Sequence, residues 1–164
     1  MAKNFVLDTS AFITLESLRI FEKVAGLFPI TTTPSAIKEL ENFAWHDDPY
    51  GRIAKRILKI KSRIAIESCP ITECIRYIEQ TDNGLYNLSR EKKLPLVTDD
   101  VTFAHHARKK IEVPFSALFL VILAQSKHLA KNEALALLEK ARDERNWKNN
   151  IIYLITKDQL EKLP

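Results

Sequence analysis

Glycine is scarce in this chain, which has only three glycines and seven prolines among its 164 residues. Flexible linkers and low-complexity segments are rich in such residues, so the composition excludes them. No segment of the sequence repeats another, which excludes a repeat architecture. A single domain over residues 1–164 is therefore predicted, and it is long enough to bury one hydrophobic core.

Cysteine and long apolar runs are also rare. Cys69 and Cys74 have no second pair of cysteines and no histidine cluster near them in the sequence, which favours two free thiols in a reducing compartment over a zinc site. The most apolar segment, residues 116–124, is far too short to cross a bilayer and predicts a core helix. The opening MAKNFVLDTS has neither the pattern of a signal peptide nor that of a membrane span. A cytoplasmic protein that makes no membrane contact is expected.

The overall composition is that of a globular protein. Hydrophobic residues make up 46% of the chain and charged residues 28%, which argues against disorder. The formal net charge is +4, with a sequence pI near 9.0. This mild positive charge permits a polyanionic partner without requiring one.

Short apolar segments alternate with segments of helical spacing. Strands are predicted at residues 3–8, 28–34, 64–68, 94–98 and 112–115. Helices are predicted at residues 9–28, 35–44, 47–63, 71–80, 82–93, 101–110 and 116–129. The expected N-cap of the second helix is Ser35, and that of the third is Asp47 or Asp48. A helical C-terminal extension is predicted from about residue 131 to about 146, and residues 151–155 fit either a strand or a helix end. The alternation predicts an α/β sandwich with a mostly parallel central sheet.

Carboxylates stand where predicted strands end, the edge at which α/β sheets bind their ligands. Asp8 ends the first strand in VLDTS, and the strand LPLVT is followed at once by Asp99 and Asp100. An aspartate before a helix is also a good N-cap, and for any one of these acids alone a structural role is the commoner one. Two adjacent acids cannot both be explained as the cap of one helix. Several acids at one edge therefore point to a cationic ligand.

The chain resembles the PIN-domain nuclease family in order over about residues 4–124. FVLDTS resembles the opening strand of that family, with its first acid at Asp8 and small hydroxyl residues after it. PITTTPSAIKELEN resembles the strand-then-helix segment that carries a glutamate, and the matching residue is Glu39. Helical periodicity alone does not distinguish Glu39 from Glu41, since both flank the apolar stripe of the predicted helix.

The stretch DNGLYNLSREKKLPLVTDDVTF carries the most recognisable part of the resemblance. In the family an acid opens a helix, and a strand follows that ends in Thr, any residue and Asp. Here these positions are Asp82, Thr98 and Asp100, with Asp99 in the variable position. Asp99 either binds a metal or only tunes its neighbour.

The resemblance implies a three-layer α/β/α sandwich and the activity of a metal-dependent nuclease that hydrolyses RNA. The implied metal ligands and catalytic residues are Asp8, Glu39, Asp82 and Asp100, and the implied cofactor is Mg²⁺ or Mn²⁺. Hard divalent ions prefer oxygen ligands, and such an ion both activates water and neutralises a phosphate. The hydroxyls expected to orient these ligands through hydrogen bonds are those of Thr9, Ser10 and Thr98.

Three roles remain open under this resemblance. The first is a VapC-like toxin that acts as a homodimer and is inhibited by an antitoxin protein. The second is a nuclease of the same fold that works in RNA processing without an antitoxin. The third is a non-catalytic RNA-binding or scaffold domain.

A basic helical segment is predicted over residues 45–70. Four of its cations share one helical stripe and are the predicted contacts to the RNA backbone, namely Arg52, Arg56, Lys59 and Arg63. A solvated helix flank whose long side chains cover the core edge explains the same pattern equally well. Trp45 and Tyr50 precede the stripe and could contact unpaired bases.

Overall fold

The computed structural model describes residues 4–76 and 78–164 and divides the chain into two compact units. The units are Met1–Pro114 and Phe115–Pro164. The second unit thus begins well before residue 131, where the sequence predicts the start of a helical extension. That the whole chain behaves as a single domain stays a prediction.

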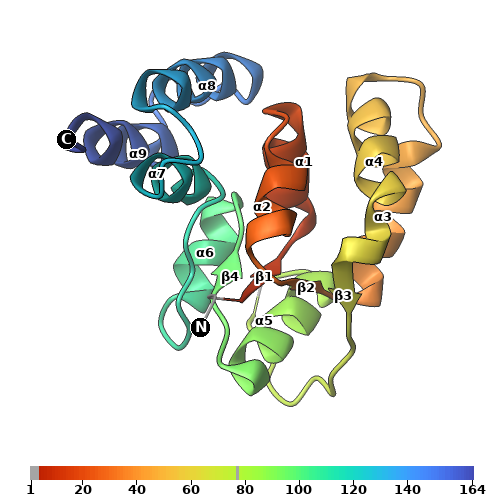
Figure 1. Cartoon of the computed structure of the whole chain (residues 1–164). Coiled ribbons are helices and arrows are strands. Elements are labelled where there is room, and N and C mark those ends of the chain that lie inside the picture. The colour runs from red at the N-terminus through yellow and green to blue at the C-terminus, as the bar shows by residue number, and fades with distance from the viewer. Residues whose placement is uncertain (1–3, 77) are drawn as a thin grey trace. The chain divides into compact units, whose positions relative to one another are not determined.

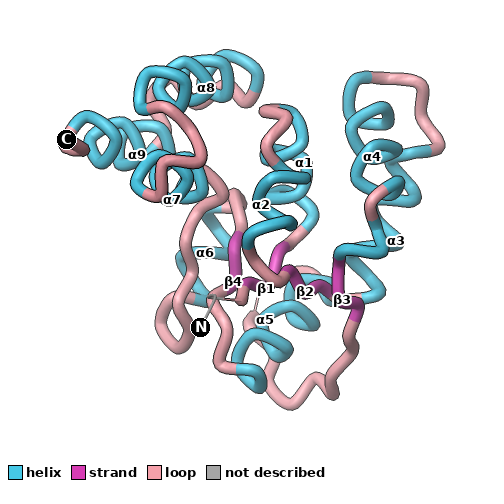
Figure 2. Tube along the Cα trace, in the orientation of Figure 1, coloured by secondary structure: helices cyan, strands magenta, loops and turns pink. Residues whose placement is uncertain are grey.

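The first unit is built on a four-stranded sheet, in which all the described strand pairings are parallel. The strand order is β3-β2-β1-β4, and the sheet is drawn in magenta in Figure 2. The strands are β1 (Phe5–Leu7), β2 (Ile30–Thr32), β3 (Ile64–Ile66) and β4 (Leu96–Val97). The predicted α/β class with a parallel sheet is confirmed. Because Leu7 pairs with Val97, the residues that follow β1 and β4 emerge side by side.

Helices cover both faces of this sheet. Val6 belongs to a core that contains Leu85 and Leu88 on one helix and Phe103 on another. Alternate residues of a strand point to opposite faces, and Phe5 meets the ring of Phe28 edge to face. Figure 1 shows α1 and α2 on the other side of the strands from α5. The helices of this unit are α1 (Thr9–Ser17), α2 (Phe21–Leu27), α3 (Pro34–Ala44), α4 (Pro49–Lys59), α5 (Gln80–Lys92) and α6 (Val101–Ala107), with a short 3₁₀ helix η1 (Lys61–Arg63).

The single helix predicted over residues 9–28 is wrong, because the chain forms two helices there. Arg19 takes a left-handed conformation with φ of 60°. Its N–H donates to the carbonyl of Glu16, and the N–H of Ile20 donates to the carbonyl of Leu15. These two bonds end α1 and satisfy its last carbonyl groups. Helical periodicity does not reveal such a stop, since no glycine marks it.

The helix predicted over residues 71–80 is also wrong for the described part of that segment. Asn87 accepts bonds from the backbone N–H groups of Thr72 and Glu73, and Asn83 accepts one from Ile75. Both asparagines are buried on α5. Their amides bind backbone groups that a helix would pair internally, so the segment stays an ordered loop. As a result α5 begins at Gln80, two residues before Asp82.

The predicted N-caps are partly correct. Asp48 caps α4, as one of the two predicted alternatives, through a bond from the N–H of Gly51 at 2.7 Å. Thr33 caps α3 in place of the predicted Ser35, because the helix already begins at the intervening proline. Proline fixes φ at a helical value and needs no hydrogen-bond acceptor at the first helical position.

Residues 112–115 lie beside β4 but do not form the predicted strand. The N–H of Leu96 donates to the carbonyl of Glu112, and the N–H of Thr98 donates to the carbonyl of Pro114. Proline has no N–H to return, so this segment cannot complete a ladder of bonds.

The second unit is a group of three helices that contact one another, and they are α7 (Leu118–Gln125), α8 (Lys131–Glu144) and α9 (Ile151–Glu161). The helix predicted over residues 116–129 forms, and so does the one predicted from residue 131. Of the two alternatives for residues 151–155, the helix is correct. Within residues 4–76 and 78–164, no helix has both the length and the apolar character that crossing a membrane demands.

Candidate functional site

Asp8 leaves β1 and caps α1 with a carboxylate whose oxygens are both hydrogen-bonded. Its Oδ1 accepts from the N–H of Ala11 at 2.8 Å. The hydroxyl of Ser10 donates to both oxygens, at 2.8 and 3.0 Å, and the hydroxyl of Thr98 donates to Oδ2 at 2.5 Å. The residue is only 5% exposed. Asp8 is therefore a fixed, buried group that has both a structural and an electrostatic role.

The same two hydroxyls also hold the turn after β4. Ser10 Oγ accepts from the N–H of Asp99 at 2.8 Å, and Thr98 Oγ1 accepts from the N–H of Asp100 at 3.1 Å. Asp100 then caps α6, because its Oδ1 accepts from the N–H of Phe103 at 2.9 Å. The two acidic strand ends are thus tied together by one small network. A functional aspartate and a helix cap are not alternatives here, since Asp100 can serve as both.

Burial raises the pKa of Asp8 from 3.8 to about 7. The hydrogen bond from Thr98 opposes this shift most strongly, and the bonds from Ala11 and Ser10 oppose it further. The negative charge of Asp99 adds to the rise in pKa. A carboxylate in this position is costly, because burial removes the water that would stabilise its charge.

Glu39 approaches the same edge from α3. The hydroxyl of Thr9 donates to Glu39 Oε2 at 2.6 Å and so links the start of α1 to α3. Glu41, which periodicity could not separate from it, is exposed and accepts from Lys61 at 3.0 Å. Glu39 therefore lies beside Thr9, which is the next residue after Asp8 in the chain.

Asp82 lies half-buried in the first turn of α5 and faces like charges. Burial raises its pKa from 3.8 to about 6, and the charges of Asp100, Glu39 and Glu79 raise it further in that order. Three predicted site residues, on three different elements, thus act on one another electrostatically. Glu79, at the N-cap position of α5, is a fourth acid that sequence analysis missed. It could have been found had the helix start been placed at residue 80.

These acids suit a hard cation by their chemistry. In the described parts of the chain, no three histidine, cysteine or acidic side chains are disposed to hold a metal ion. Mg²⁺ does not require such a cage, because it keeps several waters and uses one or two carboxylates. Besides burial, the charges of three neighbouring acids raise the pKa of Asp82, so this edge concentrates negative charge that a divalent cation would offset.

The four predicted RNA-binding cations are not on one helix. Arg52, Arg56 and Lys59 lie on α4, which ends at Lys59, and Arg63 lies in the short η1. The predicted basic segment over residues 45–70 is helical only in these two elements, because β3 and a loop make up its last part. Exposed carboxylates lie near two of the arginines, with Arg52 at 3.6 Å from Asp47 and Arg63 at 3.3 Å from Glu22.

Arg56 has a structural partner. Its Nε donates to Glu16 Oε1 at 2.6 Å, and the Glu16 side chain is only 9% exposed. Arg19 reaches the same oxygen at 3.4 Å. The pair joins α4 to α1, so Arg56 is needed to compensate a nearly buried charge.

Replacing Arg56 with Gln is expected to lower the free energy of unfolding by about 3 kcal/mol, because it leaves Glu16 nearly buried without its closest cation. The matched change Arg52→Gln should alter it by less than about 1 kcal/mol, since that pair is exposed. Urea unfolding monitored by circular dichroism measures both values. Equal effects of the two substitutions would contradict the structural role of Arg56.

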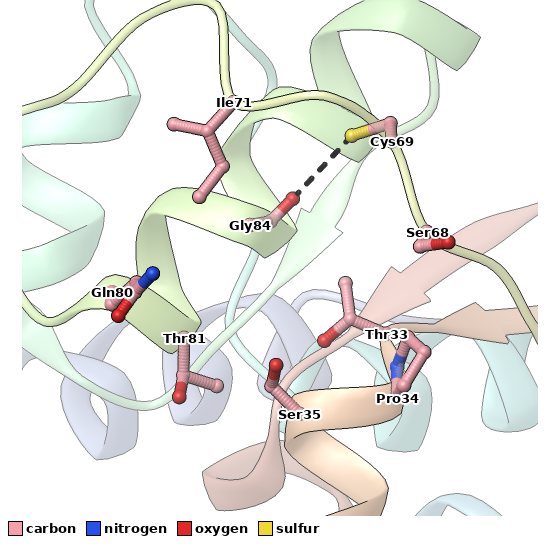
Figure 3. A pocket seen from close by; sticks show the side chains of 9 residues that line it. All are labelled: Thr33, Pro34, Ser35, Ser68, Cys69, Ile71, Gln80, Thr81 and Gly84. Carbon is pink, nitrogen blue, oxygen red and sulfur yellow. Dashed lines mark hydrogen bonds between the residues drawn. The ribbon is translucent and has the colours of Figure 1, made fainter.

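Two hollows lie between α3 and the beginning of α5. The first, of about 330 Å³, is lined mainly by hydroxyl-bearing and small side chains (Figure 3). They include Ser35 at the start of α3, Thr81 at the start of α5 and Cys69 on the loop, whose thiol points to the carbonyl of Gly84. The second, of about 420 Å³, is lined by Glu39, Asn42, Phe43, His46 and Glu79.

Comparison with known proteins identifies the fold. No protein-family model matches the sequence. Curated proteins give no match either. The structure is similar to that of PAE2754 from Pyrobaculum aerophilum, with a TM-score of 0.57 and 20% identity over 76% of this chain and 99% of the other. It is also similar to SSO1118 from the hyperthermophilic archaeon Sulfolobus solfataricus P2, a PilT N-terminus domain protein, with a TM-score of 0.50 and 11% identity over 68% of this chain and 86% of the other. PIN is the abbreviation of PilT N-terminus, so the chain has a PIN-like fold.

Proposed function

We propose that this chain is a metal-dependent ribonuclease that hydrolyses phosphodiester bonds of RNA at the carboxyl edge of its sheet. The observation that carries the proposal is the electrostatic coupling of Asp82 to Asp100, Glu39 and Glu79. Like charges gathered at a ligand-binding edge of an α/β sheet favour a cation there. The PIN-like fold supports the same function, since the sequence resembles that nuclease family.

Glu39, Asp82 and Asp100 would hold Mg²⁺ or Mn²⁺, and the buried Asp8 would add negative charge to the site. The ion would activate water and offset the charge of a phosphate. Hydroxyl side chains of the chain hold these carboxylates in position. Thr9 fixes Glu39, while Ser10 and Thr98 fix Asp8 and the turn that carries Asp100. Asp99, half-buried and close enough to raise the pKa of Asp8, tunes that residue in this proposal.

RNA is the substrate that the mild positive charge and the exposed cations of α4 support best. Lys59 and Arg52 are exposed there and can approach phosphates, and the ion pair that Arg52 would give up is a weak surface one. The finer role proposed for the chain is that of a VapC-like toxin with an antitoxin partner, acting as a homodimer. Processing of cellular RNA without an antitoxin is the alternative within the same chemistry.

The full chain, incubated with a labelled single-stranded RNA, is expected to cleave it with Mn²⁺ and to stop on addition of a chelator. Mn²⁺ should also raise the melting temperature of the protein without RNA, because a ligand that binds only the folded state stabilises it. The variant Asp82→Asn should show a smaller rise. Cleavage that persists in excess chelator, or no cleavage of any RNA with Mn²⁺, would contradict the proposed function.

A further inference from the structure

The exposed aromatic side chains of the described residues gather in one short segment. Phe43 is 41% exposed, Trp45 86% and Tyr50 44%, and the other described aromatic residues are buried or half-buried. Single exposed hydrophobic residues are common on protein surfaces, but aromatic rings bury large areas when they can. Three of them lie within eight residues, around the end of α3 and the start of α4, which indicates that at least one of these rings contacts another molecule.

One of these rings lines the second hollow, beside the acidic site. Asn42 and Phe43 lie three and four residues after Glu39, so these three side chains share one face of α3. His46 follows just beyond the end of that helix. Glu79, just before the first residue of α5, lines the opposite side of this hollow. Glu39 also belongs to the proposed cation site, so this hollow and that site share a wall.

The two hollows differ in what they can hold. The hollow in Figure 3 is lined by hydroxyls, a thiol and short aliphatic groups and has no aromatic ring among its lining residues. The second hollow is lined by a phenyl and an imidazole ring, together with an amide and two carboxylates. Flat rings that carry hydrogen-bonding edges are the ligands that fit such a lining.

We propose that the hollow formed by Glu39, Asn42, Phe43, His46 and Glu79 binds one unpaired nucleobase of single-stranded RNA, stacked on Phe43. This inference rests on the proposed function, since it places the base next to the bond that is cut. A base inside a duplex is already stacked and cannot enter, so single-stranded RNA is the substrate class. Stacking on aromatic side chains is the usual way in which proteins hold unpaired bases.

The polar groups of the hollow favour a base with an exocyclic amino group. The carboxylate of Glu79 can only accept hydrogen bonds when ionised, and an amino group donates them. The amide of Asn42 both donates and accepts, as adenine requires. Uracil has no amino group, and its single pairing-edge N–H lies between two carbonyl oxygens that carboxylate oxygens repel. Bases with an exocyclic amino group, adenine and cytosine among them, are therefore preferred over uracil.

Binding can be measured apart from cleavage in the full-length variant Asp100→Asn, which retains every residue of the hollow. Fluorescence anisotropy of labelled octamers of A, C or U in Mg²⁺ gives the dissociation constants. Adding Phe43→Ala is expected to weaken binding of the A and C octamers about 5- to 150-fold, the range for loss of one stacked base. Adding Phe43→Tyr should restore it. The matched control is Tyr50→Ala, equally exposed but outside the hollow, and it should change binding less than about threefold.

The recognition of the base edge has its own test. Glu79→Gln should reduce the preference for A and C over U, because the amide can also donate to uracil. Equal effects of Phe43→Ala and Tyr50→Ala, tight binding of the U octamer, or no binding of any octamer would overturn the proposal. If the unmodified chain fails to cleave with Mn²⁺ while the Phe43-dependent binding remains, the nuclease proposal fails and the base site stands. If the chain cleaves RNA but Phe43→Ala binds as tightly as its parent, the base site fails and the nuclease proposal stands.

Discussion

Replacing Asp100 with Asn is expected to lower Mn²⁺-dependent RNA cleavage at least about 100-fold. Residues that merely hold a metal ligand in place already cost 10- to 100-fold when removed, and Asp100 is proposed to be a ligand itself. The fold should be unaffected, because Asn is as good an N-cap as Asp and can still accept from the N–H of Phe103. Cleavage assays and a thermal melt of both proteins measure the two effects.

The same substitution has a readout that does not depend on activity. Asp100 is the carboxylate that raises the pKa of Asp82 most, so its neutralisation should lower that pKa from about 6 towards 3.8. A carboxyl titration by NMR in metal-free buffer follows the change, and Asp99→Asn serves as the neighbouring control. If Asp100→Asn cleaves at the wild-type rate, or if the titration of Asp82 is unchanged, Asp100 is not part of the proposed site.

Replacing Asp8 with Asn is expected to stabilise the metal-free protein at neutral and higher pH while it removes cleavage. The folded-state pKa of Asp8 is about 7, against 3.8 when unperturbed. A raised pKa means that the folded state favours the protonated form, so this contribution to stability is full below pH 4 and is lost as the pH rises through 7. The loss amounts to about 4 kcal/mol at most, from the conversion of about 1.4 kcal/mol per pKa unit. Asn carries no charge, so the variant does not lose this stability as the pH rises.

The stability difference between Asp8→Asn and the parent should therefore be small at pH 4 and grow up to about pH 8. Asp82 also has a raised pKa and shifts both proteins in the same direction, so the difference isolates Asp8. Guanidinium unfolding at a series of pH values provides the measurement. Asp8→Ala is the control for the cap and should destabilise, because it leaves the N–H of Ala11 and two hydroxyls without their acceptor. A sharp loss of stability in Asp8→Asn at pH 8 would show that the charge itself is needed.

Local signals identified most of the elements of the fold. Runs of β-branched and apolar residues located all four strands, since buried parallel strands read as short continuous apolar segments. Two errors in the helices have different causes. Asn83 and Asn87 prevent a helix in the loop before α5, and the left-handed Arg19 divides α1 from α2. Neither feature changes the spacing of apolar residues, so a single sequence does not reveal it.

For the site, the sequence by itself determined which carboxylates follow β1 and β4, because a strand pattern that stops at an acid is a local feature. Only the tertiary structure decided that β1 and β4 are neighbours, that Ser10 and Thr98 join their ends, and that Glu39 and not Glu41 faces them. It also brought Asp100 and Glu39 towards Asp82 and paired Arg56 with Glu16. The physical reason is that burial, charge coupling and hydrogen bonds between distant segments depend on distances in space, which the order of residues along the chain does not contain.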